Sequence, residues 1–183
     1  GSYLEDQDKL RMSGIFRDAY ILHRAEGHLT DYKIESDVAG GKGIVRFTAD
    51  KECALSLFFG GEKVASAEGS SAVFEIENAK LWSAEQPDVY ELVIFCRGEY
   101  IREYVGIRRV ETDGSVLKLN GAPIKLKGVN RHSMTVNGYV ETLSDLERDL
   151  KMFRKYNINA VRTSHYPPHP LFPVLCDLHG VYL

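Results

Sequence analysis

The sequence predicts a mainly β protein with a shorter α/β portion, namely an antiparallel β-sandwich followed by the first β/α units of a barrel. Short runs rich in Val, Ile, Phe and Tyr recur before residue 110, separated by glycine pairs such as Gly40-Gly41 and Gly60-Gly61. After residue 110 strand-like and helix-like segments alternate, which indicates parallel strands with right-handed crossovers. The last residues, 181–183, begin a further strand, so we expect a truncated barrel.

The first portion holds the segments that we expect to form the sandwich. Short strands at this spacing, with no long helical period between them, are typical of that architecture. Leu81 and Trp82, followed by Pro87, indicate a crossover loop in which the indole anchors the core. The predicted strands are residues 15–23, 31–36, 43–48, 54–59, 63–67, 72–76, 89–96 and 100–105.

The second portion opens with a predicted hairpin. Asn120-Gly121 suits a type I′ turn between strands at 116–119 and 123–127. The expected barrel strands are residues 124–129, 158–162 and 181–183. Because two parallel strands cannot cover their own apolar faces, this portion is predicted to be the opening of a (β/α)8 barrel.

Two helices are predicted between the barrel strands. Ser144 and Glu147 form the S-x-x-E pattern of a capping box. Pro170 suits a first helical position and Gly180 a C-terminal stop, which predicts a helix over 171–179. The apolar face of the first helix, with residues at helical spacing, is expected to consist of Leu146, Leu150 and Phe153.

Polar clusters follow the two complete barrel strands. In a (β/α)8 barrel the carboxyl ends of the strands share one functional rim. Imidazole groups can hydrogen-bond to sugar hydroxyls, and a flat aromatic ring can pack against a sugar face. A lone histidine is more often a structural residue, and Arg162 equally suits a buried ion pair. The residues at the predicted rim are Asn130, Arg131, His132, Arg162, His165 and Tyr166.

Composition argues against several other classes of protein. The 183 residues carry a formal net charge of -3 and no basic stripe, so we expect neither a nucleic-acid nor a membrane partner. The apolar runs are too short to span a bilayer. Neither a nucleophile elbow nor a phosphate loop occurs. The absence of a CxxC pair argues against zinc and favours free thiols at Cys53, Cys96 and Cys176.

Several ordered motifs closely resemble glycoside hydrolase family 2, and in particular its large bacterial β-galactosidases. The resemblance covers nearly the whole chain. In the second portion it rests on GVNRH at 128–132, NINAVRTSHYP at 157–167 and the stretch 175–182. In the first portion it rests on SYLEDQD at 2–8, RMSGIFRD at 11–18, NAKLWS at 78–83 and GIRR at 106–109.

The resemblance implies a domain organisation. Residues 1–110 would be an immunoglobulin-like β-sandwich, with 1–14 as a connecting segment, and residues 111–183 the N-terminal part of a TIM barrel. The chain is then expected to be an internal piece of a longer enzyme, cytoplasmic in a bacterium and homo-oligomeric. We expect the uncovered barrel strands to pack on the sandwich, to self-associate, or to be poorly ordered.

The resemblance also implies site residues. The histidines that match His132 and His165 contact galactose, and the arginine that matches Arg162 supports the nucleophilic carboxylate. The aspartate that matches Asp18 contacts the sugar and a sodium ion. The acid/base and nucleophilic glutamates and the magnesium ligands would follow residue 183. The parent enzyme is therefore expected to be a retaining β-galactosidase that uses magnesium and sodium, and this chain to be inactive and free of cofactors.

The carboxylates near the first predicted helix are not expected to replace the missing ones. Helix capping and solvation explain Glu141 and Asp145. Two alternatives remain open for the function. One is another family 2 specificity, of the β-glucuronidase or β-mannosidase type. The other is a non-catalytic carbohydrate-binding or scaffolding module, although the sandwich sequence offers no aromatic stripe that can be placed on one face.

Overall fold

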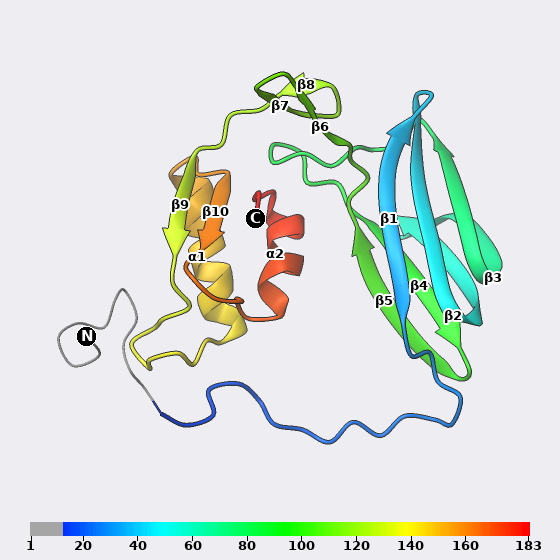
Figure 1. Cartoon of the computed structure of the whole chain (residues 1–183), viewed down its shortest axis with the longest axis horizontal. Coiled ribbons are helices and arrows are strands. Elements are labelled where there is room, and N and C mark those ends of the chain that lie inside the picture. The colour runs from blue at the N-terminus through cyan, green and yellow to red at the C-terminus, as the bar shows by residue number, and fades with distance from the viewer. Residues whose placement is uncertain (1–12) are drawn as a thin grey trace.

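The computed structural model describes residues 13–183, in which a curled antiparallel sheet precedes a small hairpin and two β/α units (Figure 1). This confirms the predicted mainly β fold with a shorter α/β portion. The motif at 2–8 and most of the predicted connecting segment at 1–14 lie outside the described residues. No helix in residues 13–183 has the length and apolar character needed to cross a membrane.

The first portion is a five-stranded sheet whose order is β1-β2-β4-β5, with β3 paired to β2. The strands are β1 (Tyr32–Ala39), β2 (Lys42–Phe59), β3 (Glu62–Glu77), β4 (Tyr90–Cys96) and β5 (Glu99–Val105). The first half of β2 pairs with β1 and its second half with β4, so the sheet curls over itself. The core that it encloses includes Val45, Phe47, Leu55, Leu92 and Ile94.

The long strands β2 and β3 differ from the prediction, which divided each of them in two. Residues 43–48 and 54–59 belong to one strand, and residues 63–67 and 72–76 belong to its partner. The polar stretch between Thr48 and Cys53 resembles a turn in sequence, but it lies at a register shift within the ladder. A bulge of this kind bends and twists a strand pair without ending it, which suits a curled sheet.

The predicted strand at residues 15–23 is wrong. Residues 13–31 carry no strand and run as an irregular, extended segment from β1 to the loop after β9 (Gly128–Arg131), which we call the N-terminal strap (Figure 1). Its apolar residues imitate a strand in sequence, yet no backbone ladder in the described chain holds them. Ile21, for example, is 98% exposed.

A small three-stranded sheet links the two portions. Its strands are β6 (Val110–Asp113), β7 (Val116–Leu119) and β8 (Ala122–Pro123). The left-handed backbone expected of the Asn120-Gly121 turn is present, with φ values of 52° and 80°. The sequence did not predict β6. Residues 124–127 were expected to be strand and carry none.

The second portion is the opening of the barrel. Its elements are β9, α1 (Leu143–Lys155), β10 (Ala160–Thr163) and α2 (Leu171–His179). β9 and β10 pair in parallel, and Tyr182 forms a parallel bridge with Ala160 on the other side of β10. The third strand therefore begins beside the second, as barrel order requires. The helices and strands share a core of Leu146, Leu150, Phe153, Val161, Phe172, Leu175, Cys176 and Val181.

The capping box of α1 is real, but the sequence prediction placed it two residues too late. Thr142 has an extended backbone, and its hydroxyl accepts a hydrogen bond from the Asp145 amide. The Asp145 carboxylate accepts one in return from the Thr142 amide at 3.0 Å. Ser144 and Glu147 lie inside the helix. The sequence contains both the Thr142–Asp145 pair and the Ser144–Glu147 pair. The first pair forms the cap because Thr142 has the extended backbone that an N-cap residue requires.

The two portions contact each other through the predicted crossover loop. Trp82 is buried, and its indole Nε1 donates to the backbone oxygen of Asp177 in α2 at 2.7 Å. The Arg108 guanidinium forms an ion pair with the Asp177 carboxylate at 3.1 Å. The Trp82 ring also meets the Tyr182 ring edge-on, with centroids 5.6 Å apart. The predicted aromatic anchor is therefore confirmed, and it joins the sheet to the barrel opening.

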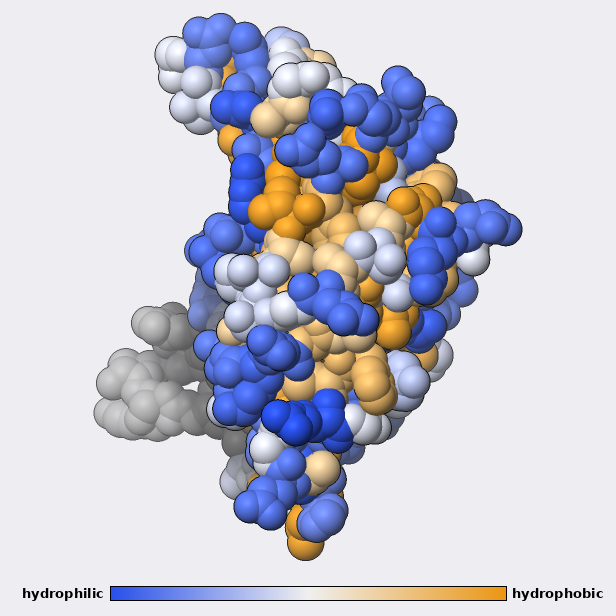
Figure 2. All heavy atoms as spheres, turned by 90° about the vertical axis from the view of Figure 1, so that its right-hand side faces the viewer, coloured by the Kyte–Doolittle hydropathy of each residue, from blue (hydrophilic) through white to orange (hydrophobic). Residues whose placement is uncertain are grey.

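Apolar side chains also remain on the outer surface of the sheet. Figure 2 shows an apolar strip that runs down the side holding β3, bordered by hydrophilic residues. An aromatic pair is exposed on neighbouring strands as well, since the Phe95 and Tyr100 ring centroids lie 4.7 Å apart. A contiguous apolar strip of this kind favours association with another surface.

Candidate functional site

The rim at the carboxyl ends of β9 and β10 brings two predicted site residues together. His132 follows β9 directly, and His165 lies two residues after β10. Their ring centroids are 5.6 Å apart and the ring planes are perpendicular. The loops stay together beyond the strands because the Ser164 amide donates to the Arg131 carbonyl at 2.9 Å. Parallel pairing thus delivers both imidazoles to one place, as the sequence predicted.

Aromatic rings line the same rim. The Tyr166 hydroxyl lies 3.5 Å from Nδ1 of His132. The Tyr166 ring meets the Tyr139 ring edge-on, with centroids 6.3 Å apart. Phe16 of the N-terminal strap packs against Tyr139 at a centroid distance of 5.8 Å. Sequence reasoning missed Tyr139 and Phe16, since nothing in their local pattern places them near the histidines.

Arg131 holds the end of β9 in a buried ion-pair network. Its guanidinium contacts Glu141 at 2.5 Å and Asp149 of α1 at 2.8 Å. It also lies over the Phe172 ring of α2, 4.6 Å from the ring centroid. Arg131 therefore links β9 to both helices, and this fixes the chain immediately before His132.

The expectation that capping and solvation explain the carboxylates near α1 is half right. Asp145 caps the helix, and its hydrogen bonds with Thr142 lower the pKa of this carboxyl. Glu141 is neither capping nor solvated, because its side chain is wholly buried against Arg131. The sequence could not reveal this burial, which depends on the loop from β9 to α1 folding back over the strand end.

The other two predicted site residues are on the surface. Arg162 lies within β10, opposite Asn130, and its side chain is exposed. The buried ion pair that the sequence allowed for Arg162 is therefore not present in the described chain. Asp18 lies on the N-terminal strap and is also exposed. Its neighbour Arg17 reaches the rim by donating to the Tyr139 carbonyl at 3.0 Å.

The described residues do not by themselves form a cation site. Within residues 13–183 no group of three or more His, Cys, Asp or Glu side chains is placed to hold a metal ion. A hard cation takes six or more oxygen ligands when bound by protein and water together. Asp18 contributes one exposed carboxylate, and a cationic side chain, Arg17, precedes it in the sequence.

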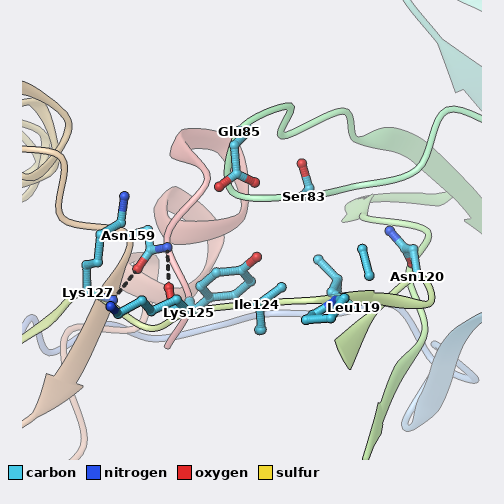
Figure 3. A pocket seen from close by; sticks show the side chains of 11 residues that line it. Ser83, Glu85, Leu119, Asn120, Ile124, Lys125, Lys127 and Asn159 are labelled. Carbon is cyan, nitrogen blue, oxygen red and sulfur yellow. Dashed lines mark hydrogen bonds between the residues drawn. The ribbon is translucent and has the colours of Figure 1, made fainter. Parts of the chain in front are cut away.

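A separate pocket of about 500 Å³ lies at the opposite end of the strands (Figure 3). The loop at Ser83 and Glu85 covers one side of it, and residues 119–127 the other. Asn159 holds its edge, since its side chain accepts from the Lys127 amide at 2.7 Å and donates to the Lys125 carbonyl at 3.0 Å. These residues precede β9 and β10, and that end of a barrel serves stability more than chemistry.

The fold and the rim define a class of protein in which a β-sandwich precedes a (β/α)8 barrel. Comparison of the sequence with family models agrees with this class. Residues 27–108 match the family model described as "Glycosyl hydrolases family 2". Residues 110–183 match the model described as "Glycosyl hydrolases family 2, TIM barrel domain". The chain therefore belongs to glycoside hydrolase family 2.

Curated relatives match the full chain. It is 40% identical to a β-galactosidase of Actinobacillus pleuropneumoniae, with all of this chain and 19% of the relative covered. It is 40% identical to a β-galactosidase of Staphylococcus xylosus, again with all of this chain and 19% of the relative covered. The chain spans about a fifth of the length of the curated relatives that it matches.

Solved structures of the family share the fold. A β-D-glucuronidase of Dictyoglomus thermophilum superposes with a TM-score of 0.79 at 25% identity, covering 84% of this chain and 28% of that one. A β-glucuronidase of Ruminococcus gnavus in complex with uronic isofagomine gives a TM-score of 0.76 at 27% identity, covering 84% and 27%. The relatives compared by sequence and by structure thus differ in the sugar that their names carry.

Proposed function

We propose that this chain is the part of a retaining β-galactosidase that joins the sandwich to the catalytic barrel and supplies one side of its sugar site. The observation that carries the proposal is the pair of imidazoles, His132 and His165, which face each other at the carboxyl ends of adjacent parallel strands. Galactoside is preferred as the substrate because the relatives at 40% identity over the whole chain are β-galactosidases.

The proposed roles follow from position on the rim. His132 and His165 hydrogen-bond to hydroxyls of the bound galactose, and Tyr166 packs near the sugar. Asp18 approaches the same sugar from the N-terminal strap. Arg162, exposed on β10, supports a nucleophilic carboxylate supplied from elsewhere in the enzyme. The sodium and magnesium ions remain an expectation for a full-length enzyme.

We propose further that the chain alone does not hydrolyse glycosides. A retaining glycosidase needs two carboxyl groups about 5–5.5 Å apart, one as acid/base and one as nucleophile. Apart from Asp18 on the N-terminal strap, the carboxylates near the rim in residues 13–183 are already engaged. Glu141 and Asp149 are paired with Arg131, and Asp145 caps α1. A steady release of dye from a chromogenic β-galactoside by the repurified chain would contradict this proposal.

The proposed division of the chain is a sandwich up to residue 110 and a barrel part from 111. It is supported by the two family matches, which end at 108 and begin at 110. We propose that the full-length enzyme is located in the bacterial cytoplasm and forms a homo-oligomer. The apolar strip on the β3 side supports association but does not identify the surface it would meet.

The decisive test uses a chimera in which this chain replaces the matching stretch of the A. pleuropneumoniae β-galactosidase. We expect turnover of a chromogenic β-galactoside, and a loss of about 100-fold or more in kcat/KM for His132→Ala or His165→Ala. His179→Ala, in α2 and away from the rim, is the matched control and should leave kcat/KM unchanged. A chimera that folds and binds galactose, yet tolerates both rim substitutions, would refute the assigned roles.

The second candidate is a β-glucuronidase, because the structural relatives at TM-scores of 0.76 to 0.79 carry that name. The same chimera tests the second candidate when it is assayed with β-galactoside and β-glucuronide side by side. A preference for the glucuronide would shift the proposal to the second candidate, since the barrel residues contributed by the host favour galactoside.

A further inference from the structure

Two arginines, each beside a proposed sugar-contacting residue, meet the same carboxylate. Arg131 immediately precedes His132 and contacts Oε1 of Glu141 at 2.5 Å. Arg17 immediately precedes Asp18, and its guanidinium lies 3.6 Å from Oε2 of Glu141. Glu141 therefore stands between the N-terminal strap and the end of β9, two segments more than a hundred residues apart in the chain.

The setting of Glu141 makes these contacts strong. Its side chain is 0% exposed, and the Arg131 side chain is 7% exposed. Oε2 has no hydrogen-bond partner among the described residues, and the Arg17 guanidinium lies 3.6 Å from it. Charges interact more strongly in such an environment than in water, and a buried carboxylate that loses its cation is costly.

The two arginines differ in their partners, so substitutions of Glu141 and of Asp149 should have different effects. Arg131 is held by two carboxylates, Glu141 from the loop and Asp149 from α1. Among residues 13–183, Arg17 contacts one carboxylate, that of Glu141, and donates to the Tyr139 carbonyl at 3.0 Å. Removing Glu141 should release the strap while leaving Arg131 partly held. Removing Asp149 should loosen Arg131 and leave the strap in place.

We propose that Glu141 is a positioning residue that sets the spacing between Asp18 on the strap and His132 on the rim. It acts through the two arginines that precede them and does not touch the sugar. The functional meaning of this spacing rests on the proposed function. The structural claim, that one buried carboxylate ties the strap to the rim, does not depend on it.

The structural claim is tested on the chain itself by NMR, without any ligand. The Phe16 and Tyr139 rings report on strap docking, at a centroid distance of 5.8 Å. The Trp82 and Tyr182 rings, at 5.6 Å, report on the fold of the barrel portion. In Glu141→Gln we expect the Phe16–Tyr139 cross-peak to disappear and the Trp82–Tyr182 cross-peak to persist.

Matched variants keep this test decisive. Asp149→Asn should retain the Phe16–Tyr139 cross-peak, because Asp149 contacts Arg131 alone of the two arginines. Should Glu141→Gln lose both cross-peaks by failing to fold, Arg17→Gln decides, since Arg17 is at the edge of the network. Loss of the Phe16–Tyr139 signal alone in Arg17→Gln supports the proposal. Retention of that signal in Arg17→Gln, or in a folded Glu141→Gln, overturns it.

The functional claim is tested in the chimera by steady-state kinetics. A displacement of about 1 Å at a binding group can cost about 100-fold in rate, so Glu141→Gln should lower kcat/KM for the galactoside by that order. Asp149→Asn should lower it less, and Glu147→Gln, whose carboxylate pairs with Lys151 of α1 and not with either arginine, should not change it. Equal losses in Glu141→Gln and Asp149→Asn would point to stability alone and overturn the positioning role. An inactive parent chimera would refute the proposed function. The NMR experiment would still test whether Glu141 ties the N-terminal strap to the rim.

Discussion

Gly180 shows how a single residue ends α2 and sets its distance from the sandwich. Its φ is 70°, a left-handed conformation, and an added Cβ would lie 2.3 Å from the Ala84 carbonyl oxygen. We expect Gly180→Ala to lower the free energy of unfolding by about 3 kcal/mol, through backbone strain and displacement of the 83–85 loop. Gly61→Ala is the control, because Gly61 has φ 87° with open space around it. It should cost about 1 kcal/mol. Urea denaturation of both variants measures the difference, and equal losses would argue against the clash.

Asp177 gives the barrel portion a pH-dependent stability. Burial raises the pKa of its carboxyl above the usual 3.8, and the nearby Arg108 opposes the shift. Because the folded state holds this proton more tightly, the contribution is fully present below the unfolded pKa and is lost as pH rises through the folded pKa.

The prediction for Asp177 concerns the slope of stability with pH. Between the unfolded and the folded pKa of Asp177, the free energy of unfolding of the wild type should fall relative to that of Asp177→Asn as pH rises. Urea denaturation at several pH values measures this difference. Asp145 is the opposite case, because hydrogen bonds with Thr142 lower its pKa. Its contribution is present at higher pH and lost as pH falls, so Asp145→Asn should show the reverse difference. If the difference in free energy of unfolding between the wild type and Asp177→Asn does not vary with pH, burial does not raise the pKa of Asp177.

At the scale of elements, α1 depends on a cap that the sequence alone could not locate. The Thr142 hydroxyl accepts from the Asp145 amide, whereas Ser144 is already the second residue of the helix. Thr142→Ala should lower the free energy of unfolding by about 1 kcal/mol, and Ser144→Ala should leave it nearly unchanged. Thermal or urea unfolding followed by circular dichroism checks the pair. A larger loss for Ser144→Ala than for Thr142→Ala would show that Ser144 is the cap, as the sequence predicted.

Elements with strong local signals were predictable. The boundaries of α2 match the prediction at residues 171–179, because Pro170 and Gly180 act on the backbone of their own neighbours. The Asn120-Gly121 turn is present for the same reason. The division of β2 and β3 was wrong because a bulge and a turn use similar polar residues, and only pairing with a neighbouring strand distinguishes them.

At the scale of the whole molecule, Trp82 joins the sheet to the barrel portion. Trp82→Phe keeps an aromatic ring beside Tyr182 but leaves the Asp177 carbonyl without its donor. An unpaired buried acceptor costs about 1–3 kcal/mol, so α2 should become less protected. Hydrogen exchange should accelerate in α2 and remain unchanged in β4. Tyr100→Phe, on the exposed face of β5, is the control. Unchanged exchange in α2 would show that the two portions do not depend on this contact.

The sequence by itself determined the order of sheet and β/α units, the helix α2, the tight turn, and the delivery of His132 and His165 to one rim. Each of these follows from local backbone preference or from the fixed geometry of parallel strands. Only the tertiary structure decided that Arg162 is exposed and Glu141 buried. It also decided that the N-terminal strap reaches the rim through Arg17. Burial and long-range ion pairs depend on residues far apart in the chain, so no local pattern encodes them.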